Sequence, residues 1–460
     1  MNETLAQAFQ LWLTFCVVYF WGGNLVCFGL LLSSFFSVRN TLRLQPLVET
    51  LKNPSTVFAP PISLITPAYN AESTIVDSLK SFLALKYPQY EVVVLNDASK
   101  DNTFSLLKET FQLESTPMVY DDRLSTSPVL GTYRSKIYPN LVVIDKATNT
   151  GKAESQNVGI GYAQYDLVCI VDSDSVLEED ALAKVALPFI QNPDKVLGCG
   201  GVNRVLNGCT VDHGRVKEVR LPRNFLGLMQ VVEYLRAFLY GRVGWNVPNT
   251  TVIISGAFGL FNKKALIAVG GYTKGSMGED AELVVRLHRY FLRNRSRYKI
   301  VFLPDPICWT EVPSTFKTLG RQRDRWQRGL AETLFAHKSM LFNPKYGFMG
   351  FVTLPYYYLI ELWGPVIEML AYLSLPIAYY FGILNREALI LFVMVTVIYG
   401  VLVSTMAVLI EEFAFAKYSR VRDLFALMGV AALENVGYRQ LNCVWRITGL
   451  LNFFRGKKSW

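Results

Sequence analysis

The chain has 460 residues, of which 51% are hydrophobic, and it carries a formal net charge of +9. Its mean hydropathy of +0.24 is too high for a purely soluble chain and predicts membrane segments. The positive charge suits loops beside anionic lipid and an anionic substrate. No compact basic DNA-binding pattern is present, so we expect no nucleic-acid partner. Seven scattered cysteines and three distant histidines argue against a disulfide framework, structural zinc and a His-based metal site.

The first segment is the nearly unbroken apolar stretch at residues 11–36, which is long enough to cross a bilayer. The flank before it has no Lys or Arg, whereas Arg39, Arg43 and Lys52 follow it. The positive-inside rule therefore places the following residues in the cytoplasm. We predict a retained N-terminal transmembrane helix within residues 1–40 rather than a signal peptide.

Residues 55–312 are predicted to form a cytoplasmic α/β domain. Short apolar strands at 62–66, 90–95, 141–144 and 167–171 alternate with helical stretches. This alternation is typical of a mostly parallel, doubly wound sheet with nucleotide-binding geometry. The polar segment at about 113–140 is too long for a simple connector and is interpreted as a surface excursion or a lid.

Asp172 and Asp174 follow the apolar strand at 167–171 directly. Ligands of open α/β sheets bind at the carboxyl ends of strands. Two carboxylates there could hold a hard divalent cation, which prefers oxygen ligands and can neutralise a diphosphate leaving group. The alternative is an ordinary junction between a strand and the turn that caps the next helix, because D-x-D is short and common.

Three further stretches have both a chemical and a structural interpretation. Lys152 lies in the turn at 148–152, where an ammonium beside backbone N–H groups suits a diphosphate, although a solvated lysine is equally compatible. The small residues at 255–259 allow a ligand to approach the backbone closely. Glu279 and Asp280 begin an amphipathic helix, where acids usually serve capping and the helix dipole.

Residues 313–345 are predicted to contain a helix that lies at a membrane surface, because an apolar stripe runs beside four closely spaced arginines. Gln322, Arg325 and Trp326 follow the spacing i, i+3, i+4 and so project within one arc of this helix. An amide, a guanidinium and an indole side by side suit a saccharide and a diphosphate.

Residues 348–415 are predicted to form the C-terminal transmembrane helices, with apolar stretches at 348–384 and 389–410, which brings the expected number of spans to three. Glu361 and Glu368 lie within the first apolar stretch. Because acids in a membrane are costly, we expect them to face protein or a watery path rather than lipid. Residues 420–460 are only partly apolar and fit interfacial or re-entrant helices with a basic C-terminus.

Six motifs occur in the order found in membrane-embedded family-2 glycosyltransferases. The chain resembles the processive synthases of hyaluronan, poly-N-acetylglucosamine, chitin oligomers and cellulose over residues 60–330. The resemblance implies a GT-A type nucleotide-sugar-binding domain between transmembrane segments, with amphipathic interfacial helices. The motifs are Pro67-Ala-Tyr-Asn70, Asn96-Asp97, Gly151-Lys152, Asp172-Ser-Asp174, Gly278-Glu-Asp280 and Gln322-Arg-Asp-Arg-Trp326.

On the donor side, the resemblance implies that Tyr69 and Asp97 contact the nucleotide and that Lys152 lies near it. Asp172 would bind the nucleotide sugar. Asp174, with Asp172, would ligate Mg²⁺ or Mn²⁺. Such a cation would neutralise charge on the leaving diphosphate.

On the acceptor side, the resemblance implies that Asp280 is the general base that deprotonates the acceptor hydroxyl. Gln322 and Arg325 would hold the diphosphate and the acceptor, and Trp326 would stack on the acceptor sugar. The Phe-x-Val-Thr-x-Lys signature of cellulose synthases is absent from the sequence, which weakens that assignment.

The sequence thus predicts an inverting β-glycosyltransferase of the cytoplasmic membrane that uses a cytosolic UDP-sugar to elongate and export an extracellular polysaccharide. Its expected partners are the donor, a growing glycan and membrane lipids, with a second copy or an accessory export subunit because three spans are few for a channel. One alternative is a single transfer to a lipid acceptor. Another is a non-catalytic translocation or scaffold subunit.

Overall fold

The computed structural model describes residues 3–53, 55–56, 58–125, 127–239, 241–383, 386–418 and 420–457. The chain forms two compact units, which are described separately below. An α/β unit comprises Phe36–Pro222 and Trp245–Val312. A helical unit comprises Met1–Phe35, Arg223–Gly244 and Pro313–Trp460.

The α/β unit is built on a ten-stranded sheet in the order β3-β4-β5-β2-β1-β6-β11-β8-β12-β7. Strands β5, β2, β1 and β6 run parallel to one another, whereas β11 is antiparallel to both β6 and β8. The predicted mostly parallel sheet is therefore confirmed. The strands are β1 (Ile62–Ala68), β2 (Tyr90–Asn96), β3 (Leu113–Ser115), β4 (Val129–Ser135), β5 (Leu141–Lys146), β6 (Leu167–Val171), β7 (Val176–Leu177), β8 (Val196–Val205), β11 (Phe258–Asn262) and β12 (Lys299–Thr310).

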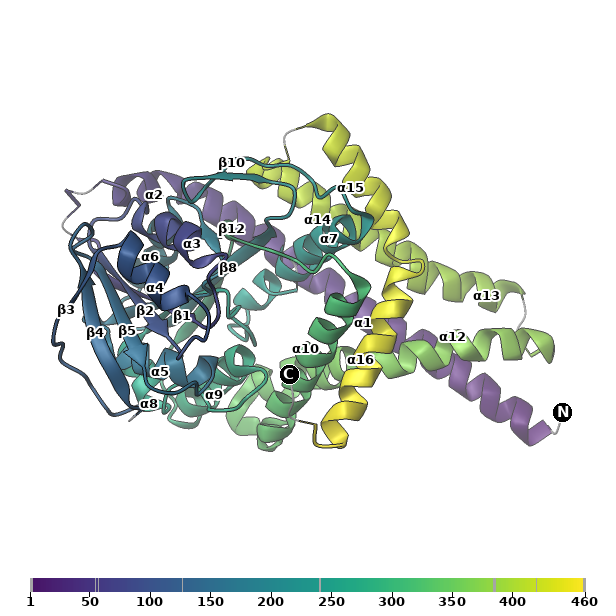
Figure 1. Ribbon diagram of the computed structural model, residues 1–460. Helices are drawn as coiled ribbons and strands as arrows, with labels where there is room; N and C mark the ends of the chain where they lie inside the picture. Colours follow the sequence, from purple (N-terminus) through teal and green to yellow (C-terminus); the bar gives the residue numbers. More distant parts are fainter. Residues whose placement is uncertain are drawn as a thin grey trace. The chain divides into compact units, whose positions relative to one another are not determined.

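Apolar side chains on both faces of the central strands explain why helices cover both sides of the sheet. Leu64 and Val92 pack into one core cluster with α3 (Ile75–Leu83) and α6 (Ala181–Gln191). Their neighbours on the opposite face pack into a second cluster with α5 (Lys152–Tyr162), α8 (Lys263–Ala268) and α9 (Glu279–Arg293). Figure 1 shows these two helical layers above and below the strands. Alternate side chains of a strand point to opposite faces, so continuous apolar strands require this double cover.

The segment at 113–140 lengthens the sheet instead of forming a separate element. Strand β4 pairs antiparallel with β5, and β3 pairs with β4. Between them, Tyr120 packs on Tyr162 of α5 with ring centroids 4.6 Å apart. The Ser125 hydroxyl donates a 2.6 Å hydrogen bond to Glu154 of the same helix. Because its described residues are anchored on α5, the structure favours the excursion over the lid.

The helical unit contains most of one long apolar helix, α1 (Glu3–Arg43), in which the most apolar window of 18 residues has a mean hydropathy of 1.9. Among the described residues, it is the helix long and apolar enough to cross a membrane. A second span results if the pair at 349–362 and 364–380, bent by 47°, is counted as one. Residues 389–410, the third expected span, are divided among α13 (Arg386–Val393), η6 (Met394–Ile398) and α14 (Tyr399–Phe415). The transmembrane arrangement stays a prediction.

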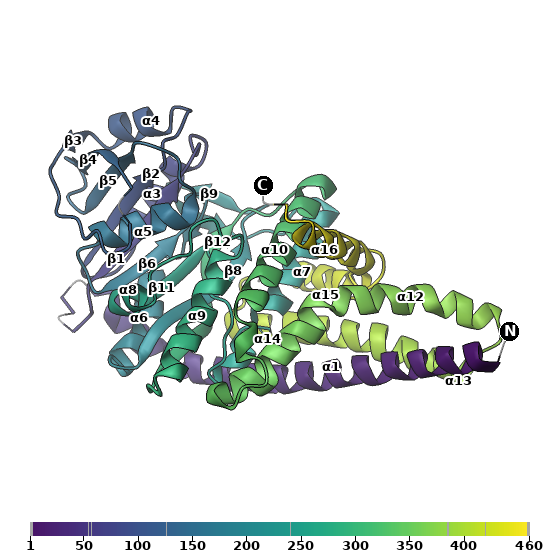
Figure 2. The same cartoon turned by 90° about the horizontal axis from the view of Figure 1, so that it is seen from below.

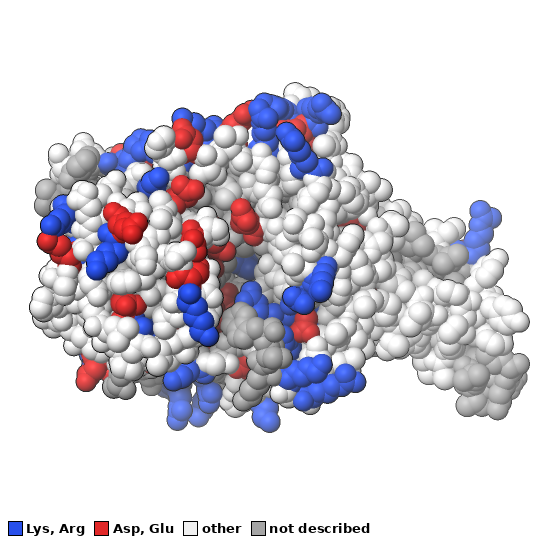
Figure 3. All heavy atoms as spheres, viewed as in Figure 1, with Lys and Arg blue, Asp and Glu red and all other residues white. Residues whose placement is uncertain are grey.

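Helix α12 extends along the same direction as α1 (Figure 2). On the face in view in Figure 3, the end of the unit that carries the N-terminus has few charged side chains among the described residues. The remaining helices are α7 (Phe225–Leu239), α10 (Phe316–Ala336), α11 (Leu354–Tyr356), α12 (Gly364–Tyr380), α15 (Val421–Leu433) and α16 (Tyr438–Phe454), with the π-helical turns η4 (Met349–Thr353) and η5 (Tyr357–Leu362).

The two acids expected to face protein both contact arginines of α16. Arg439 makes a bidentate pair with Glu368, with N–O distances of 2.6 and 3.1 Å. The Arg446 guanidinium lies 3.2 Å from the carboxylate of Glu361. A carboxylate removed from water needs such a partner, because an unpaired buried charge is costly. Both acids therefore contact protein, although the Glu361 side chain keeps an exposed fraction of 38%.

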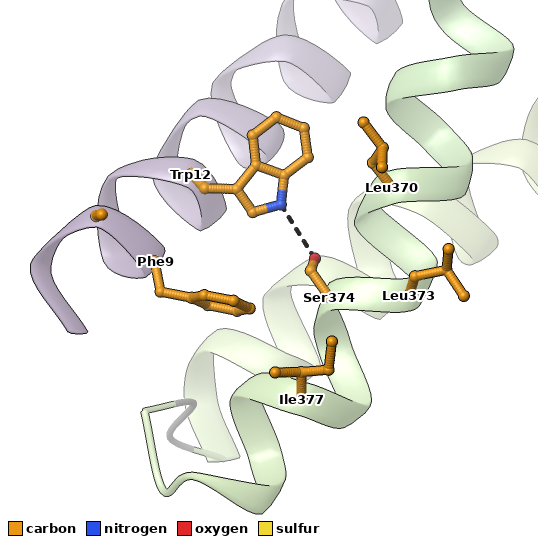
Figure 4. Close-up of a pocket in the computed structure, with 7 residues that line it drawn as sticks. Phe9, Trp12, Leu370, Leu373, Ser374 and Ile377 are labelled. Carbon is orange, nitrogen blue, oxygen red and sulfur yellow. Dashed lines mark hydrogen bonds between the residues drawn. The ribbon is translucent and has the colours of Figure 1, made fainter. Parts of the chain in front are cut away.

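An open apolar groove of about 370 Å³ lies between α1 and α12 (Figure 4). Trp12 and Ser374 point toward each other across it, and the indole N–H donates a 3.1 Å hydrogen bond to the serine hydroxyl. The indole N–H and the serine hydroxyl thus form a hydrogen bond in a groove whose other lining side chains are apolar. The groove is lined by Ala8, Phe9, Trp12, Leu370, Leu373, Ser374 and Ile377.

One buried histidine makes the stability of the α/β unit depend on pH. His288 of α9 is fully buried between the Tyr298 hydroxyl at 2.7 Å and the Thr251 carbonyl at 2.9 Å. Burial lowers its pKa to about 4, while the Thr251 carbonyl opposes the shift. The neutral ring is therefore favoured in the folded state, and stability is lost as pH falls from about 6.5 to about 4.

We predict that His288→Gln removes about 2 kcal/mol of the stability difference between pH 7 and pH 5. The measurement is the free energy of unfolding of both proteins at the two pH values. A constant offset between variant and wild type across this pH range would contradict the assignment.

Candidate active site

Parallel strand ends gather the acidic residues of the α/β unit at one edge of the sheet. Asp172 follows β6, and β11 runs antiparallel to it, with Phe258 paired to Val171. The small residues just before β11 therefore lie beside the residues just after β6. The backbone N–H of Asp172 contacts the Ala257 carbonyl at 3.4 Å. This pairing brings the glycine-containing stretch at 255–257 next to the D-x-D pair.

Lys152 is the cation at the centre of this edge. Its ammonium lies 2.6 Å from Asp172 Oδ1 and 3.5 Å from Glu279 Oε1. It also contacts the Gly256 carbonyl at 3.4 Å. Burial alone would lower the pKa of Lys152, but the charges of Asp172 and Glu279 outweigh it and the pKa is raised. Lys152 is therefore charged at neutral pH and neutralises part of the acidic cluster.

Asp280 is held in place by two backbone donors. The Gly256 N–H donates to Oδ2 at 3.1 Å, and the Ala281 N–H donates to Oδ1 at 2.8 Å. The second contact follows from its position in the first turn of α9, where N–H groups have no helical partner. Each carboxylate oxygen keeps a free lone pair, so Asp280 can still accept a proton from a hydroxyl.

Asp174 is exposed to solvent beside the charged Asp172. Partial loss of hydration and the charge of Asp172 raise the pKa of Asp174 to about 6. Two carboxylates that repel each other are a suitable pair of ligands for a divalent cation, which would relieve the repulsion. The described residues contain no group of three or more His, Cys, Asp or Glu side chains placed to hold a metal. Asp172 and Asp174 still fit Mg²⁺ or Mn²⁺, because such ions often use one or two carboxylates together with substrate phosphates.

Asp97 and Tyr69 follow neighbouring strands but differ in accessibility. Tyr69 is 45% exposed. Asp97 is buried. Its carboxylate accepts a 2.5 Å hydrogen bond from the Lys146 ammonium and further hydrogen bonds from the N–H groups of Thr150 and Gly151. Tyr69 is therefore open to a ligand, whereas Asp97 is engaged with the protein.

Gln322, Arg325 and Trp326 lie on α10, in the helical unit, as their spacing predicted. Trp326 is 43% exposed, and the Arg323 guanidinium lies 4.3 Å from its ring centroid. Arg323 itself is buried and pairs with Glu233 of α7 at 2.6 Å. One ring face of Trp326 is thus covered by a fixed cation, and the side chain remains accessible.

Sequence reasoning missed several residues that build this site. Glu279 was visible inside its motif, but its contact with Lys152 depends on how α9 is placed against α5. Gly256 could have been found from the small-residue stretch, yet its hydrogen bond to Asp280 is tertiary. Lys146 and Glu233 had no local signal, because an isolated lysine or glutamate at the end of a strand or within a helix is common.

Two family comparisons match overlapping parts of the chain. Residues 63–269 match Glycosyl transferase family 2, and residues 167–408, more than half of the chain, match Glycosyl transferase family group 2. The chain belongs to the family-2 glycosyltransferases. It is therefore a glycosyltransferase with a GT-A-like fold, and the scaffold alternative loses its basis.

Curated relatives include the poly-β-1,6-N-acetyl-D-glucosamine synthases of two staphylococci. The protein of Staphylococcus epidermidis is 29% identical over 273 residues, which is 59% of this chain and 55% of that protein. The protein of Staphylococcus aureus strain COL is 30% identical over the same length. The chain thus spans about half the length of the curated relatives it matches.

One solved structure resembles this chain in fold over nearly the whole length of both proteins. It is a mannosyltransferase from Pyrobaculum calidifontis in complex with GDP-Man and Mn²⁺, with a TM-score of 0.53 and 18% identity. The alignment covers 92% of this chain and 99% of that one. At this identity the likeness establishes the fold.

We predict that Gly256→Ala lowers the rate of glycosyl transfer about tenfold or more, because small displacements of catalytic groups have large effects. A Cβ there would lie 3.0 Å from the Lys152 ammonium, so the ammonium must move by a few tenths of an ångström, whereas a distance of 3.7 Å to Asp280 Oδ2 is an ordinary contact. The measurement is the rate of transfer together with the unfolding temperature. Gly429→Ala is the control, since a Cβ there meets nothing within 4 Å. An unchanged rate in Gly256→Ala would contradict the assigned geometry.

Proposed function

We propose that the chain is an inverting β-glycosyltransferase that uses a UDP-sugar to elongate a polysaccharide. The observation that carries this proposal is the convergence of Lys152, Asp172, Glu279 and Asp280 at the end of β6. The curated relatives, named as poly-β-1,6-N-acetyl-D-glucosamine synthases, favour N-acetylglucosamine as the sugar.

The proposed reaction is a direct displacement at the anomeric carbon of the donor. The acceptor hydroxyl attacks from the face opposite the diphosphate while Asp280 takes its proton. The new C–O bond forms as the bond to the diphosphate oxygen breaks, and the diphosphate leaves with the electron pair. A single displacement inverts the configuration at this carbon.

Positive charges and hydrogen-bond donors would stabilise the charge that develops on the leaving group. A divalent cation held by Asp174 and Asp172 would supply positive charge at the diphosphate. Lys152, which lies 2.6 Å from Asp172, carries a further positive charge on a flexible stem that can reach toward phosphate oxygens. The family resemblance assigns to Arg325 and Gln322 the role of further donors to the diphosphate and the acceptor.

The membrane part of the proposal rests on α1 and on the charges that follow it. Arg39, Arg43 and Lys52 follow the apolar stretch of α1, and by the positive-inside rule they favour the cytoplasmic side for the α/β unit. The paired acids Glu361 and Glu368 are compatible with helices in an apolar environment. We therefore propose an integral protein of the cytoplasmic membrane that elongates, and exports, an extracellular glycan.

The test is incubation of the purified full chain with Mg²⁺ or Mn²⁺ and labelled UDP-N-acetylglucosamine, followed by sizing of the products. We expect a ladder of polymer that EDTA abolishes. Asp280→Asn should lower the rate about 100-fold or more, because it removes the base but keeps a hydrogen-bonding side chain.

Asp166→Asn is the matched control, since Asp166 is an exposed carboxylate that contacts Lys264 at 3.4 Å. Full activity of Asp280→Asn would overturn the role of Asp280. Transfer from another sugar nucleotide alone would overturn the choice of donor, and a single lipid-linked product would replace elongation with one transfer.

A second test concerns Trp326, whose exposed indole suits stacking on a sugar ring. We predict that Trp326→Ala shortens the polymer or lowers its yield about tenfold or more, whereas Phe425→Ala, another exposed aromatic side chain of the helical unit, leaves both unchanged. The measurement is the size distribution of the labelled product. Polymer of normal length and yield from Trp326→Ala would overturn the role of Trp326 in holding the acceptor sugar.

A further inference from the structure

The loop at residues 269–278 connects α8 to α9 and leads directly into the helical turn that carries Asp280. Residues 273–275 of this loop are exposed, whereas Gly271 and Tyr272 at its start are buried. The path of the loop determines where the first turn of α9 begins. The contacts at its buried start therefore bear on the position of the Asp280 carboxylate.

Asn157 of α5 holds the start of the loop with both ends of its amide. Its Nδ2 donates a 2.9 Å hydrogen bond to the Tyr272 carbonyl, and its Oδ1 accepts the Tyr272 N–H at 2.7 Å. Asn157 is 3% exposed, so water cannot readily replace these two bonds. Removal of the amide would leave both backbone groups of a buried residue without these partners.

The loop fits closely against α5 at this point. Gly271 adopts a φ of 67°, and a Cβ there would collide with Asn157 Oδ1. A glycine suits position 271 for its conformation and for the space that the amide occupies. The Tyr272 side chain lies in the same apolar cluster as Val158 of α5 and Leu283 of α9.

Helix α9 is bonded to the same loop from the other side. The Thr273 hydroxyl donates a 2.8 Å hydrogen bond to Glu282 in the first turn of α9. Arg286, one turn further along, donates to the Gly271 carbonyl at 2.6 Å and pairs with Glu282 at 2.9 Å. The loop therefore joins two helices, α5, which begins with Lys152, and α9, whose first turn carries Asp280.

We propose that Asn157 is a positioning residue: by bonding both backbone groups of Tyr272, it fixes the first turn of α9 against α5 and so sets Asp280 relative to Lys152. The proposal rests on the proposed function, because it assumes that Asp280 takes the proton of the acceptor hydroxyl. Asn157 acts through the loop, without touching a substrate. Its removal should therefore affect the rate of transfer more than the affinity for the donor, since Asp172 follows β6 and does not move with α9.

The test measures two quantities for the purified full chain and its variants with Mg²⁺ present. One is the rate of transfer from saturating labelled UDP-N-acetylglucosamine, and the other is the affinity for UDP. We expect Asn157→Ala to lower the rate about tenfold or more and to leave the Kd for UDP within about threefold. In an Asp280→Asn background, the same substitution should lower the remaining rate less than about twofold, because a residue that acts through Asp280 then has no base to position.

Asn246→Ala is the matched control. The amide of Asn246 makes the same two hydrogen bonds, to the carbonyl and the N–H of Phe302 in β12, at 2.7 and 2.8 Å. Strands β8 and β11 separate β12 from β6, which leads to the acidic cluster. We expect Asn246→Ala to lower the unfolding temperature and to keep the rate of transfer within about twofold of the wild type.

Thr273→Val is a milder variant for the case that Asn157→Ala does not fold. It keeps the size of an exposed side chain and removes the hydrogen bond to Glu282. We expect it to lower the rate of transfer about threefold or more, and again to have little effect in the Asp280→Asn background.

A wild-type rate from Asn157→Ala, or from Thr273→Val where the first variant does not fold, would overturn the proposal. An equal loss of rate in the Asp280→Asn background, or in Asn246→Ala, would assign the effect to general destabilisation. A loss of UDP affinity as large as the loss of rate would move the role of Asn157 to donor binding. Full activity of Asp280→Asn, or absence of transfer by the wild type, would instead overturn the proposed function itself.

Discussion

Electrostatic repulsion among carboxylates is the constraint on which the arrangement of the α/β unit depends. Asp172, Asp174, Glu279 and Asp280 approach one another from two different elements, and burial raises the pKa of Glu279 even with Lys152 nearby. Such a cluster is costly to assemble unless positive charge and N–H donors offset it. Lys152 and the backbone of residues 256 and 281 provide part of that compensation. The remaining negative charge is what a cation and a sugar nucleotide would meet.

Compensation of this kind needs rigid placement, and the sheet topology supplies it. The antiparallel strand β11 brings Gly256 beside Asp172. Because glycine has no side chain, position 256 leaves room for the Lys152 ammonium. Behind the site, Lys146 and Asp97 connect two parallel strands to the turn before α5. An ion pair buried this deeply adds little net stability, because the cost of desolvating both charges offsets much of their attraction. Its main effect is to fix the relative positions of the segments that it joins.

In the helical unit, arginines provide the positive charge that compensates the carboxylates. Glu233, Glu361 and Glu368 lie among apolar helices, and each has an arginine partner. Two of these arginines belong to α16, and the third, Arg323, also covers one face of Trp326. Two of the charged residues in the C-terminal segment are thereby explained: Arg439 and Arg446 are partners of acids elsewhere in the unit. The ion pair between Arg323 and Glu233 therefore also fixes the guanidinium that lies against Trp326, the side chain proposed to hold a sugar.

The sequence by itself determined the α/β class, the four central strands and the residues at their ends, because continuous apolar strands and the polar residues that follow them are local signals. It also placed Gln322, Arg325 and Trp326 on one helix, because helical spacing is local. It could not show that Asp97 is engaged by Lys146, that Glu279 contacts Lys152 or that Arg439 pairs with Glu368. Those contacts join residues that are distant along the chain, so they depend on how strands and helices pack. Only the tertiary structure decided which charges are paired, and pairing decides which side chains remain available to a ligand.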